Sequence, residues 1–300
     1  MQTIHTDIFI LGAGPGGATA ALFLAKENIP CVLADKAIFP RDKICGDALS
    51  GKVVEIFNRY DEKFIERLSL DPIQLNCWGV EFVAPNLESL KVPFKINHAE
   101  HNAIRKQAPG FIAKRIDFDN FLIDEVKKQK YIRLYEGCDI DKVERASTGF
   151  ILYSKNKEIV FHAKLVIAAN GAHSDFAKEI GGIEVERKHY CAGIRAYYKN
   201  VSGMKEGNYI ELHFLKDFLP GYFWIFPLPN GEVNIGLGMR SDYVSKKKID
   251  LKKKLTEVIE KYPQLKERFK DAEPTDKIRG YGLPLGSKKR KLSGDNYMLV

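Results

Sequence analysis

Three glycines at GxGxxG spacing, Gly12, Gly14 and Gly17, constrain the fold of this chain more than any other feature. A short β-branched apolar run, Ile8–Leu11, precedes them and is typical of a buried strand. A stretch of helical composition, Ala18–Ala25, follows them. In such a unit the first glycine permits the tight turn, the second lets the backbone approach a pyrophosphate, and the third lets helix and strand pack closely.

A second apolar strand, Cys31–Ala34, ends on Asp35, which lies 23 residues after Gly12. A carboxylate at that position can accept hydrogen bonds from a ribose, and the start of the preceding helix offers unpaired N–H groups to phosphates. A glycine turn by itself is often only structural. With a strand before it, a helix after it and the acid in place, the pattern predicts a dinucleotide-binding unit. The sequence contains one such unit, so we expect no separate nicotinamide domain of the Rossmann type.

The composition is that of an ordinary globular protein, because 45% of the 300 residues are hydrophobic and 29% are charged. No apolar run approaches the roughly 20 residues that a membrane-spanning helix needs. The N-terminus enters the first strand without room for a signal peptide, so we expect a cytoplasmic location. The five cysteines form no CxxC pair and the seven histidines no HExxH pattern, which predicts reduced thiols and no metal site.

The net charge of +8 comes partly from three basic clusters, 246–248, 252–254 and 288–291. One interpretation is solvated surface, which we favour. The alternative is attraction to an anionic membrane or a phosphorylated substrate, since basic residues near a bilayer gain about 1 kcal/mol each. Nucleic acid is not an expected partner, because no recognition fold accompanies the charge.

Two further stretches carry candidate chemistry. The loop after Asp35 contains Arg41 and Lys43, which can face phosphates or a flavin ring, and then Cys45-Gly46, where the backbone can pass close to a flat ring. Later, Tyr222, Trp224 and Phe226 recur at period two within a predicted strand, so their side chains point to one face. By itself this aromatic face indicates sheet packing or an apolar pocket.

Apolar runs along the rest of the chain predict a mixed α/β protein. Predicted strands lie at 77–84, 90–94, 132–135, 139–146, 150–154, 158–161, 165–169 and 296–300, with an antiparallel group at 189–199, 207–215, 221–229 and 232–239. Predicted helices lie at 53–60, 114–128, 249–260 and 263–269. The strand 165–169 is followed by the turn Asn170-Gly171 and a helix start at Ser174, which repeats the architecture of the opening unit.

Together these motifs resemble the geranylgeranyl reductase family of FAD-dependent oxidoreductases, within the hydroxylase-like flavoprotein class. The resemblance covers nearly the whole chain. GAGPGGATAA with Asp35 resembles the FAD pyrophosphate and ribose site, PRDKICG (40–46) resembles the family's PRxKxCG, and Arg115 with Phe118-Asp119 resembles its RxxFD element. The most specific match is to YxWxFP followed by GxG, at Tyr222, Trp224, Phe226, Pro227, Gly236 and Gly238.

The resemblance implies roles for these residues. The implied cofactor-binding residues are Gly12, Gly14, Pro15, Gly16, Gly17, Asp35, Lys36, Arg41, Cys45, Gly46, Arg115, Asn170 and Gly171. The implied prenyl-binding residues are Tyr222, Trp224, Phe226, Pro227, Gly236 and Gly238, and the catalytic candidates are Cys45, Tyr222 and Trp224. The chain departs from the family twice, since Asn170-Gly171 replaces the usual Asp-Gly and Asp47 replaces a glycine that often follows Cys-Gly.

The implied fold class is α/β, with a Rossmann-like FAD-binding domain around a central parallel sheet and an inserted antiparallel-sheet domain. Residues 1–75, 105–180 and 276–300 would form the FAD-binding domain, and residues 76–104 and 181–275 the substrate-binding domain.

The implied activity is an FAD-dependent reduction of carbon–carbon double bonds in a polyprenyl lipid, with NADPH or a protein as a transient reductant and peripheral membrane contact. The alternative enzyme is a flavin monooxygenase or halogenase of the same fold. Flavin halogenases carry WxWxIP, whereas this chain has YFWIFP. A third interpretation is a flavoprotein electron carrier or a lipid-binding module without turnover.

The last stretch, 295–300, has the hydrophobicity of a strand that enters a core and stops at Val300. In the family this strand runs into a GDAAG element that is implied to bind the flavin's ribityl chain. Residues 1–300 contain no second copy of it. We therefore expect the chain to be part of a longer one, with weakened FAD affinity and an exposed apolar patch as the physical consequences.

Overall fold

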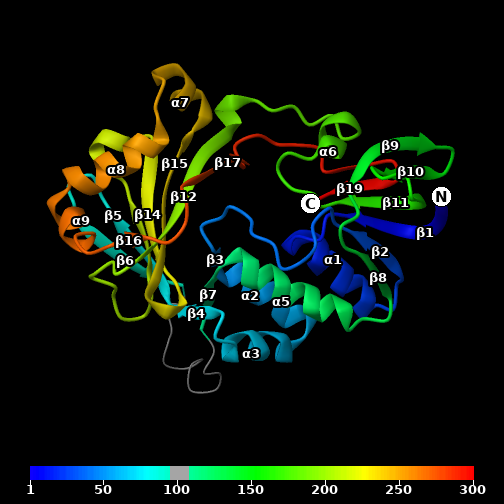
Figure 1. The fold of residues 1–300 in the computed structure, drawn as a ribbon, viewed down its shortest axis with the longest axis horizontal. Coiled ribbons are helices and arrows are strands. Elements are labelled where there is room, and N and C mark those ends of the chain that lie inside the picture. The colour runs from blue at the N-terminus through cyan, green and yellow to red at the C-terminus, as the bar shows by residue number, and fades with distance from the viewer. Residues whose placement is uncertain (95–107) are drawn as a thin grey trace. The chain divides into compact units, whose positions relative to one another are not determined.

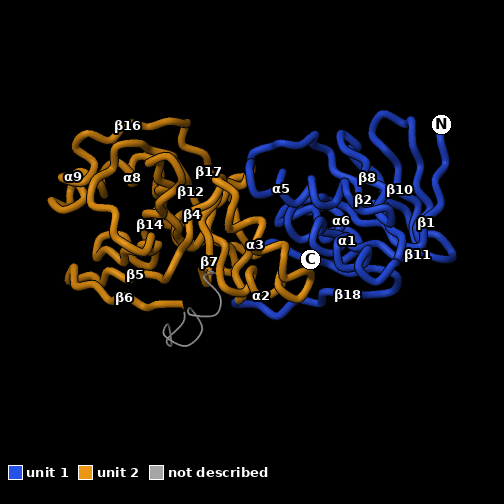
Figure 2. Tube along the Cα trace, turned by 90° about the horizontal axis from the view of Figure 1, so that it is seen from below, with its two compact units in different colours: residues 1–42, 116–185, 287–300 blue, residues 43–115, 186–286 orange. Residues whose placement is uncertain are grey.

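The structure is a computed structural model that describes residues 1–94 and 108–300. The chain divides into two compact units, coloured separately in Figure 2: unit 1 comprises residues 1–42, 116–185 and 287–300, and unit 2 comprises residues 43–115 and 186–286. Residues 43–75, which the predicted division assigns to the FAD-binding domain, lie in unit 2. The predicted boundary at 104/105 falls outside the described residues. The roles given to the two predicted domains stay a prediction.

Unit 1 is built on a mainly parallel sheet with the strand order β18-β19-β11-β1-β2-β8 (Figure 1). Its parallel strands are β1 (Gln2–Leu11), β2 (Cys31–Ala34), β8 (Ile132–Tyr135), β11 (Ile159–Ala168) and β19 (Tyr297–Leu299). Antiparallel partners are β18 (Ser293–Gly294), which pairs with β19, and β10 (Gly149–Ser154), which pairs with β11 and with β9 (Ile140–Ala146). The predicted central parallel sheet is therefore confirmed.

Three helices belong to this unit: α1 (Pro15–Lys26), α5 (Arg115–Lys127, of which Arg115 lies in unit 2) and α6 (Asp175–Glu179). α1 is rich in alanine, and its small side chains Ala18 and Ala21 are fully buried, which allows close packing on the neighbouring strands. α6 begins at Ser174, whose hydroxyl accepts a hydrogen bond from the Ala177 N–H at 2.9 Å. This cap confirms the predicted helix start.

Unit 2 is built on a second eight-stranded sheet with the order β16-β12-β15-β14-β13-β5-β6, and β17 pairs with β12. Its strands are β5 (Gly79–Val83), β6 (Ser89–Pro93), β12 (Tyr190–Lys199), β13 (Ile210–His213), β14 (Gly221–Pro227), β15 (Glu232–Arg240), β16 (Glu273–Pro274) and β17 (Arg279–Pro284). All neighbours are antiparallel except β13 and β5, which run parallel. The antiparallel group predicted between 189 and 239 is thus present.

A small sheet and five helices complete the sheets and α-helices described for unit 2, in residues 43–94, 108–115 and 186–286. The small sheet has the order β3-β7-β4, formed by β3 (Ala48–Leu49), β7 (Gly110–Ala113) and β4 (Gln74–Cys77). The helices are α2 (Gly51–Tyr60), α3 (Glu62–Leu70), α7 (Ser241–Lys247), α8 (Leu251–Lys261) and α9 (Pro263–Arg268). Short 3₁₀ turns occupy Arg187–His189, Lys216–Phe218 and Pro229–Gly231.

β14 separates two environments by the side-chain period of a strand. Phe223 and Ile225 are fully buried in a core cluster with apolar residues of β15, α8 and α9. Trp224 and Phe226 belong to a different cluster on the other face, together with Tyr197 of β12. The predicted alternation along this strand is therefore correct.

Several elements differ from their predictions. The elements α3, α7 and β7 lie outside the predicted ranges, and the predicted strand 77–84 is divided between β4 and β5. One strand is longer than predicted. The predicted strands 158–161 and 165–169 form the single strand β11, which continues through Lys164. The first half of β11 pairs with Gln2–Thr6 of β1, so β1 is also longer than the predicted Ile8–Leu11. Lys164 keeps its ammonium exposed and pairs with Asp7 of β1 at 2.7 Å, which lets a charged residue stand within the strand.

Candidate functional site

The glycine turn of unit 1 has no room for side chains. Gly12 has φ of +98°, and a Cβ there would lie 2.7 Å from the Ala169 carbonyl oxygen and from the Asn170 Cα. A Cβ on Gly17 would lie 1.8 Å from the Gly12 carbonyl oxygen. The turn is therefore held between the start of α1 and the end of β11, and two predicted cofactor residues, Gly12 and Asn170, lie side by side.

The first turn of α1 lies at the surface of the protein. Gly14 is the N-cap and supplies no side-chain hydrogen bond, and Pro15 is the first helical residue. Gly16 is exposed, so the backbone approaches the surface here. A helix of this length with an uncapped N-terminus presents free N–H groups and the positive end of its dipole, which suits a pyrophosphate.

Asp35 fixes the same turn from the end of β2. Its two carboxylate oxygens accept hydrogen bonds from the Ala13 and Ala37 N–H groups, each at 2.8 Å. The side chain is half-buried, and each oxygen keeps a lone pair for a ribose hydroxyl. Lys36, the next predicted residue, is exposed. These residues and the glycine turn fit the adenosine diphosphate part of FAD.

Arg41 has a partner that the sequence did not predict. Its Nη1 lies 2.6 Å from Oδ2 of Asp119, whose side chain is fully buried in α5. The guanidinium also lies over the Phe39 ring, 4.8 Å from the ring centroid. The arginine of the PRxKxCG element is thus fixed by the aspartate of the RxxFD element, and both residues belong to unit 1.

In unit 2 the aromatic side chains of the YxWxFP element form a continuous row. Ring centroids of Tyr222 and Trp224 are 5.9 Å apart, and those of Trp224 and Phe226 are 6.2 Å apart. On the adjacent strand, Gly238 pairs with Tyr222 and Gly236 pairs with Trp224. A Cβ on Gly236 would lie 2.2 Å from Cζ2 of the indole, so glycine is needed there for the Trp224 ring to lie over β15. Pro227 ends the strand, paired with Val233.

The loop that carries Cys45 packs on this row. A Cβ on Gly46 would lie 3.0 Å from Cε2 of Phe226, so the backbone passes against the aromatic ring. The Cys45 thiol is free and half-buried. Its carbonyl oxygen accepts a hydrogen bond from Nδ2 of Asn234 at 2.9 Å.

Asp47 is a buried acid in the same loop. Its Oδ2 accepts hydrogen bonds from the Tyr197 hydroxyl at 2.7 Å and from Nδ2 of Asn234 at 2.8 Å, and its Oδ1 accepts a longer one from the Arg115 N–H at 3.3 Å. Burial raises the pKa of Asp47 to about 6, although these hydrogen bonds and the nearby Arg195 guanidinium act to lower it. Its φ is +67°, which is uncommon for a residue with a side chain.

The sequence patterns do not predict that Asn234 and Tyr197 belong to this site, or that both donate hydrogen bonds to Asp47. A signal for Asn234 was present, because it is an amide inside the apolar strand EVNIGLGM and shares its face with Gly236 and Gly238. In the sequence, Asp47 stands out only as a departure from the family pattern. Arg115, predicted as a flavin or phosphate contact, is placed here by its backbone N–H on Asp47.

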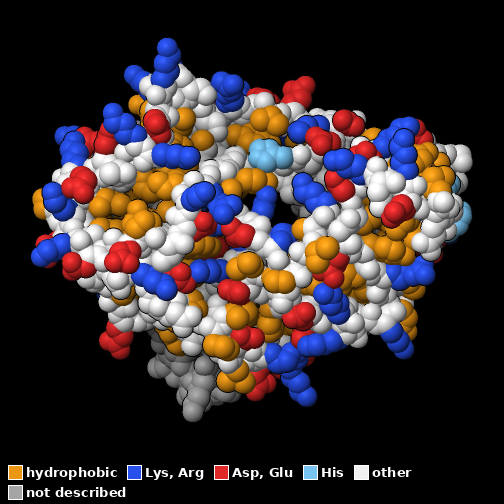
Figure 3. Space-filling view, viewed as in Figure 1, with side chains coloured by type: hydrophobic (Ala, Val, Ile, Leu, Met, Phe, Trp, Pro, Cys, Tyr) orange, Lys and Arg blue, Asp and Glu red, His pale blue; other side chains and the backbone are white. Residues whose placement is uncertain are grey.

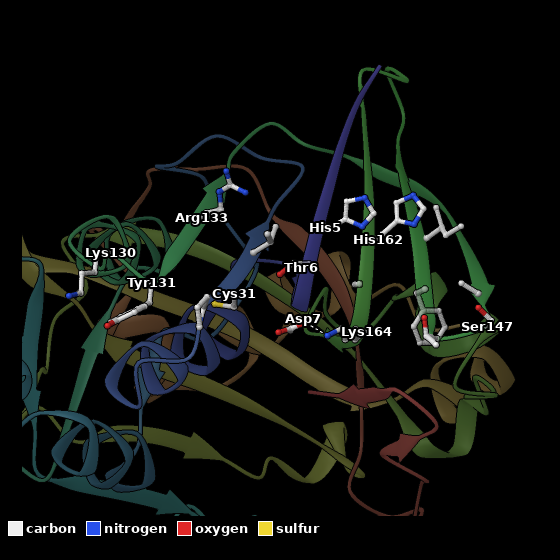
Figure 4. A pocket seen from close by; sticks show the side chains of 17 residues that line it. His5, Thr6, Asp7, Cys31, Lys130, Tyr131, Arg133, Ser147, His162 and Lys164 are labelled. Carbon is white, nitrogen blue, oxygen red and sulfur yellow. Dashed lines mark ion pairs between the residues drawn. The ribbon is translucent and has the colours of Figure 1, made fainter.

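A cavity of about 1040 Å³ lies elsewhere in unit 1 and contains none of the predicted site residues (Figure 4). It is lined by the beginnings of β2 and β8, by the middle of β1 and β11, and by the β9–β10 turn. His5 and His162 stack there with ring centroids 4.8 Å apart, and Lys164 pairs with Asp7. The Gly12 turn follows the opposite, carboxyl end of β1, so the cavity is separate from the dinucleotide site.

Charged side chains of both signs are interspersed over the face shown in Figure 3. Two lysines of the predicted basic cluster 252–254 pair with one acid of the same helix, Lys253 with Glu257 at 4.0 Å and Lys254 with Glu257 at 3.0 Å. Within residues 1–94 and 108–300, no helix is long and apolar enough to cross a membrane.

Two family models match the chain. One, described as FAD binding domain, matches residues 5–215, and the other, described as geranylgeranyl reductase catalytic domain, matches residues 190–274. The second match contains the aromatic row of β14 and the glycines of β15.

Relatives and solved structures agree with these matches. The chain is 28% identical over 302 residues to digeranylgeranylglycerophospholipid reductase 2 of Methanosphaera stadtmanae, which covers 99% of this chain and 70% of that protein. It is 27% identical over 310 residues to menaquinone reductase of Mycolicibacterium smegmatis, with 99% and 69% covered.

Among solved structures, a geranylgeranyl bacteriochlorophyll reductase-like protein from Thermoplasma acidophilum has the same fold, with a TM-score of 0.81, 21% identity, and 99% and 71% of the two chains covered. A flavin-dependent brominase also shares the fold, with a TM-score of 0.78, 18% identity, and 99% and 71% covered. With the glycine turn, the aromatic row and both family matches in agreement, this chain belongs to the geranylgeranyl reductase family of FAD-dependent oxidoreductases.

Proposed function

We propose that this protein saturates carbon–carbon double bonds of a polyprenyl lipid. The observation that carries the proposal is the aromatic row of β14, which packs against glycines of β15 and against the Cys45–Gly46 backbone. FAD, when bound in its reduced form, supplies the hydride for such a reduction. Relatives at 24–28% identity include several digeranylgeranylglycerophospholipid reductases, which supports a polyprenyl substrate.

The residues of unit 1 that would hold the cofactor are those of the glycine turn and the ribose acid. The N–H groups at the start of α1 would bind the pyrophosphate, and Asp35 would bind the ribose. Asn170 lies beside Gly12 just after β11, and Asn170 and Gly171 belong to the same predicted set. Cys45, Gly46 and Arg115 stay predicted cofactor contacts on the strength of the family motifs.

An unactivated alkene offers no oxygen that the protein could polarise. The protein must therefore position the chain, exclude water and deliver a proton. Tyr222, Trp224 and Phe226 would hold the apolar chain, and the faces of their rings would attract positive charge that develops on it. The Cys45 thiol, half-buried in the loop on Phe226, is the proposed proton donor or relay.

Anaerobic turnover tests the proposal. The FAD-loaded protein is reduced without oxygen and mixed with a geranylgeranyl lipid. Reoxidation of the flavin together with a product two hydrogens heavier supports the reductase. A flavin that is reoxidised by oxygen alone, with an oxygenated or halogenated product, favours the monooxygenase or halogenase and overturns the proposal. No product under either condition would instead support an electron carrier or a lipid-binding module.

Cys45 is tested in the same assay. Cys45→Ala and Cys45→Ser, each shown to retain FAD, should lose turnover by about 100-fold, a common effect of removing a proton donor. Unimpaired turnover by both variants removes Cys45 from the mechanism but leaves the reductase function in place.

The reductant is proposed to be NADPH or a redox protein that visits the flavin transiently, because the chain contains one GxGxxG unit. Rapid mixing of the oxidised protein with NADPH, followed at the flavin absorbance band, measures this directly. NADP that co-purifies in a one-to-one ratio with FAD would contradict a transient visit.

Peripheral membrane contact is proposed from the apolar substrate and the exposed lysines of α7 and α8. Sedimentation with anionic vesicles at low salt should exceed sedimentation with neutral vesicles, and about 0.5 M salt should abolish the difference by screening. Equal, negligible sedimentation with both kinds of vesicle would make the lysines solvated surface only.

A further inference from the structure

Asn234 connects three groups of unit 2 through one side chain. Its Oδ1 accepts a hydrogen bond from Nε1 of Trp224 at 2.9 Å. Its Nδ2 donates to the Cys45 carbonyl oxygen at 2.9 Å and to Oδ2 of Asp47 at 2.8 Å. The residue is fully buried, so water does not replace these partners, and the amide uses both its acceptor and its two donor hydrogens.

Asp47 is the second anchor of this arrangement. Its carboxylate is fully buried and also accepts the Tyr197 hydroxyl, while its carbonyl oxygen accepts the Ala113 N–H at 3.0 Å. These bonds hold a left-handed backbone conformation that is unfavourable for a residue with a side chain. The backbone at 45–47 is thereby fixed on both sides, to β12 and β15 by side chains and to β7 by the main chain.

We propose that Asn234 is a positioning residue of the reductase site, which holds the Cys45 backbone and the Trp224 indole in one arrangement, with Asp47 as its second anchor. We call the hydrogen bonds of Asn234 to Trp224, Cys45 and Asp47 the clamp, and all of them lie within unit 2. The effect of the clamp on turnover rests on the proposed function, whereas its existence does not. Loss of the amide frees the indole N–H and the Cys45 carbonyl together. A proton donor and an aromatic wall that are misplaced by 1 Å lose much of their effect on a reaction.

The clamp depends on the charge of Asp47. The Arg195 guanidinium and the Tyr197 hydroxyl, both of β12, act on this carboxyl, and Arg195 is itself paired with Asp276 at 3.2 Å. Lys114, after β7, lies over the Tyr197 ring and is paired with Glu232 at 2.6 Å. Two donors meet at Oδ2, so the ionised carboxylate binds them more strongly than the neutral acid does. With the pKa of Asp47 raised to about 6, the clamp should weaken as pH falls through that value.

The first test needs no turnover. Cys45 of the FAD-loaded protein is alkylated with iodoacetamide and followed by peptide mass spectrometry, which separates it from the other four cysteines. Asn234→Ala should raise the alkylation rate of Cys45 by about tenfold, since two hydrogen bonds that restrain the loop are lost. A rate within about twofold of the wild type in a folded variant overturns the clamp.

Asn208→Gly is the matched control. Asn208 also donates its amide to a backbone carbonyl, that of Asn76 at 3.0 Å, and it has a positive φ of 45°, so glycine removes the bond without straining the backbone. Its Cys45 alkylation rate should stay within about twofold of the wild type. An equal acceleration in the control would show general loosening of unit 2 and would overturn a specific role for Asn234.

The second test measures turnover. Asn234→Ala should lower kcat for the geranylgeranyl lipid about tenfold and change KM less than about threefold, because positioning is lost while the apolar pocket remains. The kcat of the wild type should fall as the pH drops below about 6, because the Asp47 carboxylate becomes protonated. Asp47→Asn, a variant of the same shape, should not show this fall. Retention of that fall in Asp47→Asn overturns the titrating anchor. If the wild type reduces no polyprenyl lipid, the proposed function fails, and the alkylation rates still decide the clamp.

If Asn234→Ala does not fold, Asn234→Ser replaces it, because the hydroxyl is smaller than the amide and cannot reach three partners. Faster alkylation in Asn234→Ser supports the clamp, and a wild-type rate overturns it.

Discussion

Arg41 and Asp119 are 78 residues apart in the chain and meet in an ion pair of 2.6 Å. The carboxylate is fully buried and the guanidinium is mostly so. The contact joins the loop after β2 to α5 within unit 1, and it links two sequence elements that the family motifs present separately. Both side chains therefore stabilise the fold of unit 1, in addition to any contact that they make with a cofactor.

Arg41→Met should destabilise the protein by about 3 kcal/mol, because it leaves a charge at a buried position without its main partner. The measurement is urea unfolding of the variant, of Asp119→Asn and of the double variant, from which the coupling energy follows. Lys178→Met is the control, since its 2.8 Å pair with Asp175 leaves both charged side chains exposed, and it should cost less than about 0.5 kcal/mol. A coupling energy near zero would contradict the structural task of the pair.

Gly236→Ala should be much less tolerated than Gly193→Ala, although the two glycines lie on adjacent strands. The new methyl at 236 would overlap the indole of Trp224 and a backbone oxygen of β12, whereas at 193 its nearest neighbour is 3.7 Å away. We expect a loss of about 2–3 kcal/mol at 236 and less than about 1 kcal/mol at 193 in urea unfolding. Equal losses at both sites would show that the indole can move aside freely.

Gly17→Ala should abolish stoichiometric FAD binding, because its methyl would collide with the carbonyl of Gly12 and push the helix away from the turn. Titration of the apo protein with FAD, followed by flavin fluorescence, measures the affinity. Gly280→Ala is the control, since a methyl there makes only ordinary contacts of 3.6 Å. Wild-type affinity in Gly17→Ala would place the pyrophosphate site elsewhere.

Glu211 should give the protein a stability that disappears in acid. Burial acts to raise its pKa, but hydrogen bonds from His213 and Arg268 prevail and lower it to about 2, against 4.5 for the ordinary group. A depressed folded-state pKa contributes stability above the unfolded value, which is lost as pH falls from about 4.5 to 2. The full effect is about 3 kcal/mol. Glu211→Gln should flatten the dependence of the unfolding free energy on pH in this window, and an unchanged slope would exclude Glu211 as its source.

Local patterns were sufficient to predict the unit of strand, glycine turn and helix at the start of the chain, and the aromatic strand. The strand, the glycine turn and the helix between Ile8 and Asp35 are close together in the sequence, so a local pattern identifies them. The period of two in a strand likewise assigns Trp224 to one face without tertiary information. Such inferences need only neighbours in sequence.

The remaining parts depend on partners that are far away in the chain. No local signal pairs Arg41 with Asp119, or Asn234 with Cys45, because each contact forms only after strands and helices have packed. The continuation of β11 through Lys164 likewise depends on its parallel pairing with β1, which extends from Gln2 to Leu11. Tertiary contacts decide these features, and they override the local propensity of a charged residue to end a strand.

The alternation along β14 lets two kinds of sequence change accumulate independently. Phe223 and Ile225 are the strand's contribution to the buried core, whereas Tyr222, Trp224 and Phe226 face the proposed prenyl pocket. Selection for another lipid chain length could therefore act on every second position and leave the packing that holds the sheet together untouched. A combinatorial library at 222 and 226 would sample new substrates on a constant scaffold. Trp224 would be kept, because its indole N–H donates to Asn234 and its ring occupies the space that glycine leaves at 236.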